Sequence, residues 1–102
     1  MTPVDFENHV LTHMKAASLE VPYCALALAG EAGEVANRVK KCVRDDGSRI
    51  GAEARADILF ELGDVLWYTT ALTINLGSTL EEIMELNEEK LNARRAEQKV
   101  TG

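Results

Sequence analysis

The sequence predicts an all-α fold of four helices that form a single domain over residues 1–102. Apolar residues recur at helical spacing along most of the chain. Strict alternation of apolar and polar residues never lasts long enough to indicate a strand. Of the 102 residues, 46% are hydrophobic and 27% are charged, which is typical of one globular domain and excludes a disordered chain.

Proline and a short breaker segment delimit the first two helices. The first helix is expected to begin at Pro3, with Thr2 as its N-cap, because proline suits the first helical position. The second should run from about Pro22 to Arg44. Residues 45–48, with the sequence Asp-Asp-Gly-Ser, then interrupt the helical pattern.

The other two helices are delimited by a glycine and a capping sequence. The third is expected from about residue 52 to residue 76, with Gly77 as its stop signal. The fourth should open at the capping box formed by Ser78 and Glu81. It is expected to fade into a frayed tail over residues 95–102.

Charge and composition exclude several classes of partner. The net charge of −6 repels phosphate backbones, so no nucleic acid polymer is expected to bind. No apolar run approaches the roughly 20 residues of a membrane span, and the first residues lack the pattern of a secretion signal. Cys24 and Cys42 match no zinc motif and are expected to be free buried thiols. We therefore expect a cytoplasmic protein without a membrane partner.

The third helix is apolar on two sides, with a polar stripe between them. A helix with this pattern is buried on both sides, so the stripe should be enclosed rather than solvated. The broad face comprises Ile58, Leu62, Val65, Leu66, Leu72 and Leu76. The second face comprises Phe60, Trp67, Ala71 and Ile74, and the stripe comprises Asp57, Glu61, Asp64, Tyr68 and Asn75.

The second face of this helix predicts an oligomer. The chain offers three other helices, and the first of them is short. These helices are too few to cover both apolar faces of the third helix within one chain. We therefore expect a helical bundle completed by homo-oligomerisation, as a homodimer or a dimer of dimers, with this face at the interface.

Two pairs of carboxylates predict a metal site. Glu31 and Glu34 form E-x-x-E on the second helix, and Glu61 and Asp64 form E-x-x-D on the third. Each pair lies on one helical face, and the short connection makes the two helices antiparallel neighbours. An all-oxygen cluster favours Mg²⁺, with Mn²⁺ as an alternative ion.

The fourth helix places cationic and amide side chains on its apolar side. Asn87, Lys90 and Arg94 share that side, whereas its glutamates face outward. These three residues are expected to form a clamp that faces the carboxylates. Metals on one wall and cations on the other suit a polyphosphate ligand.

These motifs resemble those of the MazG-like nucleotide pyrophosphohydrolases. The similar segments are LAGEAGEVANRVKK, ELGDVLWY and NEEKLNARR, which together span about residues 26–95. The resemblance implies a four-helix MazG-like fold and an enzyme that converts a nucleoside triphosphate to the monophosphate and pyrophosphate, for housecleaning of the nucleotide pool. It implies magnesium ligands at Glu31, Glu34, Glu61 and Asp64, and phosphate contacts at Lys41, Asn87, Lys90 and Arg94.

Within that resemblance, Glu34 and Glu61 are the expected catalytic residues, and Glu34 is our candidate for orienting the attacking water. Tyr68 lies one turn after Asp64, where it could contact the base or sugar or could pack in the core. Two alternatives stay open: a sister enzyme of the phosphoribosyl-ATP or dUTP type, and a non-catalytic helical dimerisation module.

Overall fold

A computed structural model of the protein describes residues 1–101, with side chains described up to residue 98. Within that range it contains no strand, which confirms the predicted all-α class with four α-helices. The elements are α1 (Pro3–His13), a 3-10 turn η1 (Ala16–Leu19), α2 (Val21–Asp45), α3 (Ala52–Asn75) and α4 (Leu80–Thr101). No helix in the described part of the chain combines the length and apolar character needed to cross a bilayer.

The helix boundaries follow the local signals in the sequence. The Thr2 hydroxyl accepts a hydrogen bond from the Asp5 backbone N–H at 3.1 Å, and the Thr2 backbone N–H donates to the Asp5 carboxylate at 2.9 Å. This capping box confirms the predicted start of α1. Gly77, just beyond α3, has a φ of +75°, a backbone conformation that glycine adopts without steric cost.

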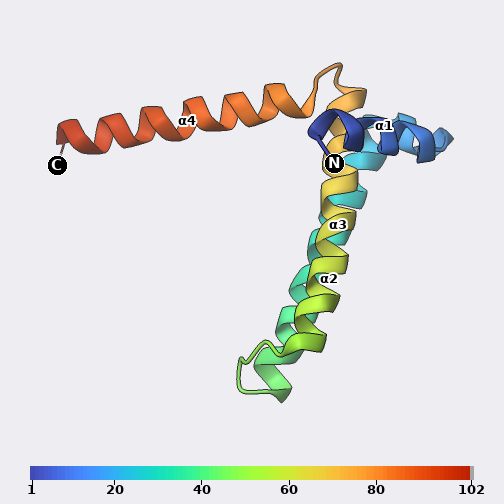
Figure 1. The fold of residues 1–102 in the computed structure, drawn as a ribbon, viewed down its shortest axis with the longest axis vertical. Helices are drawn as coiled ribbons and strands as arrows, with labels where there is room; N and C mark the ends of the chain where they lie inside the picture. Colours follow the sequence, from blue (N-terminus) through green and yellow to red (C-terminus); the bar gives the residue numbers. More distant parts are fainter. Residues whose placement is uncertain (102) are drawn as a thin grey trace.

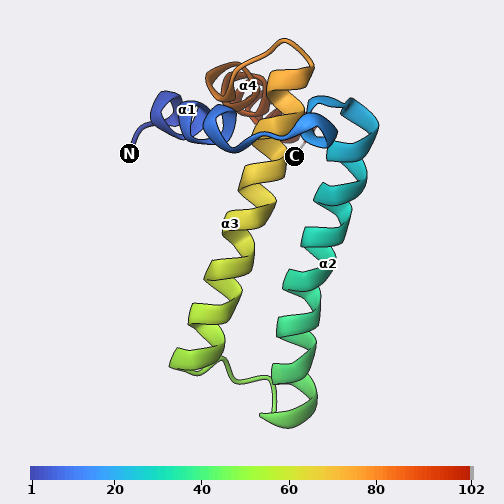
Figure 2. The same ribbon diagram turned by 90° about the vertical axis from the view of Figure 1, so that its right-hand side faces the viewer.

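The longest helices form an antiparallel hairpin from which α4 projects as an arm. α2 and α3 lie side by side along most of their length (Figure 2) and make the most extensive contact between elements. α4 leaves the top of α3 and runs away from the hairpin (Figure 1). Within the described part of the chain it touches α1 and α3 but not α2. The resulting molecule is L-shaped and measures 50 × 41 × 27 Å.

The buried core lies at the corner of the L. Val10 of α1, Cys24 of α2 and Ala71 of α3 are fully buried. Five partly buried side chains pack around them: Phe6, Met14, Trp67, Leu72 and Ile74. The core therefore joins α1 to the upper half of the hairpin.

The residues of this core differ from those expected for the two apolar faces of α3. Ala71, Trp67 and Ile74, which we expected at a subunit interface, pack against the chain's own core, because α1 lies across the upper part of that face. Only Phe60, below the reach of α1, remains 77% exposed. The apolar strip that α3 leaves open lies on another side and consists of Leu59, Leu62 and Leu66.

The start and end of α4 also differ from the expectation. α4 begins one residue later than predicted, because the hydroxyl of Thr79, rather than that of Ser78, accepts the backbone N–H of Glu82 at 3.1 Å. The first helical N–H, that of Leu80, donates to a carboxylate oxygen of Glu7 in α1 at 3.2 Å. At the other end the helix continues to Thr101 rather than fading after residue 95, and Gly102 lies outside the described residues.

Candidate metal centre

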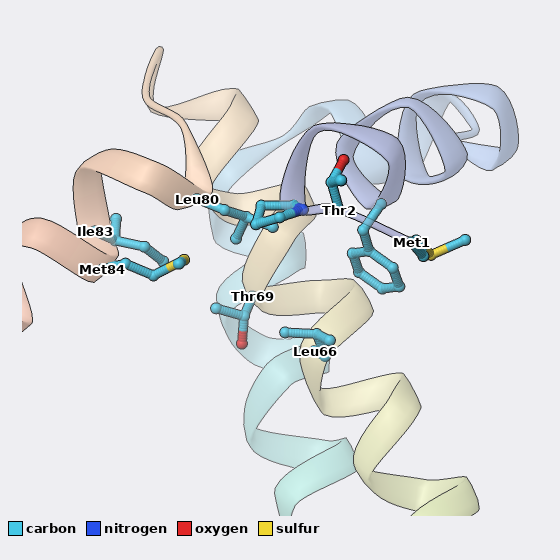
Figure 3. Close-up of a pocket in the computed structure, with 9 residues that line it drawn as sticks. Met1, Thr2, Leu66, Thr69, Leu80, Ile83 and Met84 are labelled. Carbon is cyan, nitrogen blue, oxygen red and sulfur yellow. The ribbon is translucent and has the colours of Figure 1, made fainter.

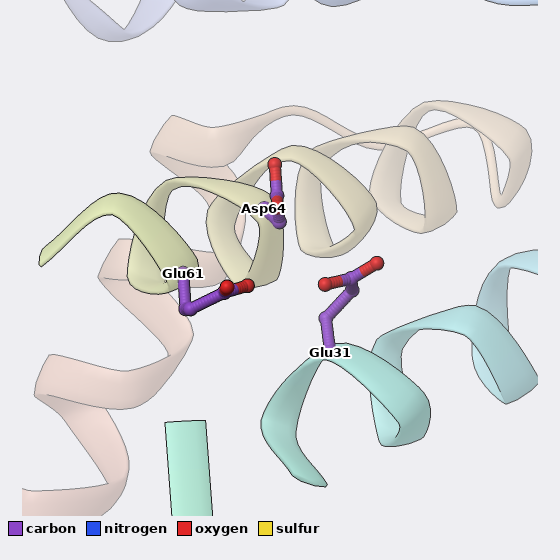
Figure 4. Close-up of side chains that lie close together, drawn as sticks. All are labelled: Glu31, Glu61 and Asp64. Atoms are coloured by element: carbon purple, nitrogen blue, oxygen red, sulfur yellow. The ribbon is translucent and has the colours of Figure 1, made fainter. Parts of the chain in front are cut away.

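Three carboxylates converge halfway down the hairpin. Glu31 of α2 and Glu61 and Asp64 of α3 each offer a carboxylate oxygen, and these oxygens lie within 4.8 Å of one another. Figure 4 shows Glu31 and Glu61 directed toward each other across the gap between the two helices, with Asp64 beside them. The antiparallel packing of α2 and α3 therefore brings an acidic residue of each predicted motif to one place.

Electrostatic crowding acts most clearly on Glu31. Burial raises the pKa of the Glu31 carboxyl above its ordinary value, and the negative charges of Asp64, Glu61 and Glu34 raise it further. Three like charges this close together, two of them on half-buried side chains, are unfavourable without a counter-charge. A cation placed among them would relieve both the repulsion and the loss of hydration.

One counter-charge comes from the protein itself. A guanidinium nitrogen of Arg38, on α2, lies 3.4 Å from a carboxylate oxygen of Glu61, whose side chain is only 13% exposed. Arg38 follows Glu31 by seven residues, two helical turns, and therefore projects from the same face of α2. It offsets part of the acidic charge of this group of three carboxylates.

The donor set fits magnesium. Mg²⁺ prefers hard oxygen donors at about 2.1 Å, so two opposite ligands of one ion lie about 4.2 Å apart. Separations of up to 4.8 Å among the three carboxylates need only a small side-chain adjustment to reach that geometry. The residues that the structure brings together can therefore hold the ion that the sequence predicts.

Glu34, the fourth predicted ligand, lies at the edge of the site. Its side chain is exposed and is not among the three converging carboxylates, although its charge raises the pKa of Glu31 one turn away. Lys41 lies farther along α2, where it and Arg38 line a small pocket of about 120 Å³ that includes Asp57 of α3. Both residues are thus on the hairpin that carries the acidic group.

The expected clamp on α4 does not face the acidic group of its own chain. Asn87, Lys90 and Arg94 are exposed, and among the residues that the structure describes α4 makes no contact with α2. The helical periodicity places these residues on one face of α4 but says nothing about the direction in which α4 leaves the hairpin. The hydrogen bond from the Leu80 backbone N–H to the Glu7 carboxylate helps to set the direction of α4.

Tyr68 lies above the carboxylates in an aromatic group. Its ring is 5.0 Å from that of Trp67 and 6.4 Å from that of Tyr23, measured between centroids. Burial raises the pKa of the Tyr68 hydroxyl, and neighbouring Tyr23 and Glu31 add to this effect. The half-buried ring therefore packs against neighbouring side chains and lies next to Glu31, while a contact with the base or sugar stays a prediction.

Sequence reasoning missed two polar contacts, one at the site and one at the end of α3. Arg38 follows Glu31 by seven residues, and this spacing could have indicated its ion pair with Glu61. Asn75, the last member of the polar stripe, donates from its side-chain amide to the backbone carbonyl of Ser18 at 2.6 Å. That bond ties the end of α3 to η1, and no local signal in the sequence indicates it.

Comparisons with known proteins identify a family for most of the chain. Residues 23–98 match the family described as the MazG nucleotide pyrophosphohydrolase domain. The chain is also 44% identical over 73 residues to the Gene 37 protein of Mycobacterium phage L5, an alignment that covers 72% of this chain and 64% of that protein. No solved structure matches the chain.

The match and the acidic hairpin define the class of protein. It is an all-helical domain of the nucleotide pyrophosphohydrolase type, matched over a segment that begins before Glu31 and ends after Arg94. The chain belongs to the MazG family.

Proposed function

We propose that this protein is a Mg²⁺-dependent nucleoside triphosphate pyrophosphohydrolase. It converts a ribo- or deoxyribonucleoside triphosphate to the monophosphate and pyrophosphate, and it serves in housecleaning of the nucleotide pool. The convergence of Glu31, Glu61 and Asp64 between α2 and α3 carries this proposal, because these carboxylates come from the two acidic motifs of a family of nucleotide pyrophosphohydrolases. Location in the cytoplasm stays a prediction from the sequence.

Each residue of the site has a role in this reaction. Glu31, Glu61 and Asp64 hold the metal ion, which when bound supplies positive charge to the phosphate oxygens. Glu34, exposed one turn from Glu31, orients a water molecule and accepts its proton as the water attacks phosphorus. The α–β phosphoanhydride bond breaks, and pyrophosphate leaves. Lys41 lies on the same helix face as Glu34 and contacts the phosphates, and Tyr68 contacts the base or sugar.

The proposed active form is a homodimer, or a dimer of such dimers. A compact monomer of 11.2 kDa exposes about 5,700 Å². This chain exposes 7498 Å², an excess of about 1,800 Å² per chain, which in a dimer falls within the range of obligate interfaces. Leu59, Leu62 and Leu66, which are 49%, 43% and 47% exposed, form one strip along α3 for such an interface. Sedimentation that finds only monomer at micromolar concentration contradicts this part of the proposal.

The proposal is tested by measuring pyrophosphate release from a panel of nucleotides with Mg²⁺ and with EDTA. We expect Mg²⁺-dependent release by the wild-type protein and none by Glu61→Gln, whose circular dichroism should remain that of the wild type. Glu53→Gln, at the exposed first turn of the same helix, is the matched control and should keep full activity. Full activity of Glu61→Gln contradicts the proposed site.

The same panel separates the alternative functions. Hydrolysis of only phosphoribosyl-ATP or dUTP identifies a sister enzyme with the same metal chemistry and a narrower base preference. A dimer that hydrolyses none of the nucleotides and gains no thermal stability from Mg²⁺ with nucleotide is a helical dimerisation module instead.

A further inference from the structure

α1 carries two histidines, one helical turn apart, that the proposed reaction does not use. His9 and His13 stand at positions i and i+4, so their side chains project from one side of the helix. The centroids of the two rings are 4.7 Å apart, and the ring planes meet at 49°. Both residues are exposed. The structure therefore holds two imidazoles side by side, within reach of a ligand from solvent.

Packing and a hydrogen bond orient both rings. The ring of His9 lies against that of Phe6, with 5.5 Å between centroids, and Phe6 packs on the buried core. Nδ1 of His13 lies 2.9 Å from the backbone carbonyl oxygen of His9. A carbonyl oxygen can only accept, so Nδ1 of His13 donates this hydrogen bond and carries the proton. The other nitrogen of the neutral His13 ring, Nε2, is then left with a free lone pair.

This arrangement matches the way in which helices present histidine to a metal ion. A spacing of four residues puts two histidines on one helical face in helices that bind zinc. A ligating histidine usually donates its other ring N–H to a backbone carbonyl or a carboxylate, which fixes the tautomer and the direction of the ring. His13 already makes such a hydrogen bond.

The separation of the rings also suits one ion. Zn–N bonds of about 2.0–2.1 Å place two ligand nitrogens of one ion roughly 3.3–4.2 Å apart. Two rings whose centroids are 4.7 Å apart reach this spacing by small rotations about their side-chain torsions. The two imidazoles can therefore chelate one ion without any change in the backbone of α1.

The surroundings of the pair supply no third ligand. Within the described residues, no carboxylate or cysteine lies close enough to form a group of three with the two histidines. Asp5, one turn before His9, accepts the Thr2 backbone N–H in the capping box. The pocket of about 430 Å³ beside the first turn of α1 is lined by apolar side chains and two threonines, and neither histidine borders it (Figure 3). An ion at the pair thus has two protein nitrogens and completes its coordination with water.

We propose that His9 and His13 form a second cation site, which binds a divalent transition-metal ion of the zinc type rather than Mg²⁺. Imidazole nitrogen suits Zn²⁺, Ni²⁺ and Cu²⁺, whereas Mg²⁺ prefers oxygen donors and dehydrates reluctantly. The group of three carboxylates lies halfway down the hairpin, and α1 lies across the upper end of the hairpin (Figure 2). The two sites therefore differ in place and in ligand chemistry, and Mg²⁺ does not compete for the histidines.

An ion at this pair stabilises α1. This helix has only 11 residues, which is too short for a stable helix on its own. Its Phe6 and Val10 side chains cover the core, so the fold depends on α1 being formed. A metal that joins two successive turns binds the folded helix and not the unfolded chain, and it therefore raises the thermal stability of the protein.

Calorimetry with Zn²⁺ in the presence of excess Mg²⁺ tests the proposal. His9→Gln and His13→Gln should each weaken Zn²⁺ binding on the order of 100-fold, because the remaining imidazole binds without the chelate. The matched control is His13→Gln/Leu11→His, which keeps two histidines but places the second on another side of α1, and it should bind as weakly as His13→Gln. Zn²⁺ affinity that is unchanged in either single variant, or restored in the control, overturns the proposal.

A second measurement uses the wild-type protein and does not depend on the folding of any variant. The chain contains two histidines, so its imidazole ring protons give two sets of NMR signals. Substoichiometric Cu²⁺ in excess Mg²⁺ should broaden the signals of both rings together, before any other signal in the spectrum. Broadening of one ring alone, or of neither, overturns the shared site. Zn²⁺ should also raise the Tm of the wild type in excess Mg²⁺, and an unchanged Tm contradicts the stabilisation of α1.

Discussion

Replacing Glu31 by glutamine should make the metal-free protein more stable and abolish its binding of Mg²⁺. The Glu31 carboxylate lies among those of Glu61 and Asp64, and burial together with their charges raises its pKa. The amide keeps the shape of the side chain and removes its charge. The metal-free fold is relieved of repulsion, and the ion loses a ligand that it requires.

The expected gain follows from the geometry of the acidic group. Two unit charges 4.8 Å apart repel by about 0.9 kcal/mol at the dielectric constant of water and by about 3.5 kcal/mol at an effective value of about 20. Asp64 is exposed and Arg38 offsets part of the charge on Glu61, so the smaller figure applies. A net gain of about 1 kcal/mol raises the Tm of a domain of this size by about 4–8 °C.

Thermal unfolding in EDTA and in Mg²⁺ measures both effects. The control is Glu85→Gln, an exposed position on the outward face of α4, which should leave both curves unchanged. The reasoning is refuted by a Glu31→Gln protein that is less stable than the wild type in EDTA, or by one that gains as much stability from Mg²⁺ as the wild type does.

Three further predictions follow from single features of the molecule. Arg38→Gln removes the cation beside Glu61, so metal-free stability should fall by less than about 1 kcal/mol. Calorimetry should find tighter Mg²⁺ binding, and an unchanged Mg²⁺ affinity would contradict the ion pair. The folded-state pKa of Glu31 is raised above its ordinary value of 4.5. The contribution of Glu31 to metal-free stability is therefore fully present below pH 4.5 and is lost as the pH rises through the folded-state pKa. Mg²⁺ affinity should rise over the same pH range. A plot of metal-free stability against pH should lose this slope in Glu31→Gln, and an unaltered slope would exclude Glu31 as its source. Gly77→Ala should cost about 1–2 kcal/mol in urea unfolding because the φ of Gly77 is +75°. Gly33→Ala, within α2 with open space around it, should add about 0.5–1 kcal/mol, and equal effects would show that φ is not the cause.

Local signals in the sequence predicted the hairpin and most of its acidic group. The carboxylates at i and i+3 on α2 and α3 share a helical face, and a short connection makes these two helices antiparallel neighbours. Those two facts were enough to bring Glu31, Glu61 and Asp64 together. Periodicity could not separate Glu34 from these three, because a residue one turn away lies on nearly the same face.

The features that were missed depend on contacts between distant parts of the chain. Trp67 and Ile74 lie on a face of α3 that is apolar in the sequence, but α1 covers it within the same chain. The sequence therefore indicated a buried face without indicating which element buries it. In the same way, periodicity places Lys90 and Arg94 on one face of α4, while the direction of that helix depends in part on Glu7, 73 residues before Leu80.

The hydrogen bond from Leu80 to Glu7 lies at the start of α4, so a small change of angle there moves the far end of the helix by a larger distance. Arg94 lies roughly 21 Å beyond that bond, so a tilt of about 10° at the start of α4 displaces it by about 4 Å. Such a displacement is larger than the tolerance of a charge-assisted hydrogen bond. Substitutions in the first helix would then adjust the fit of distal cations to a ligand that α1 itself does not touch. In the proposed enzyme, variation near the N-terminus of this chain is therefore expected to change how tightly the triphosphate is held.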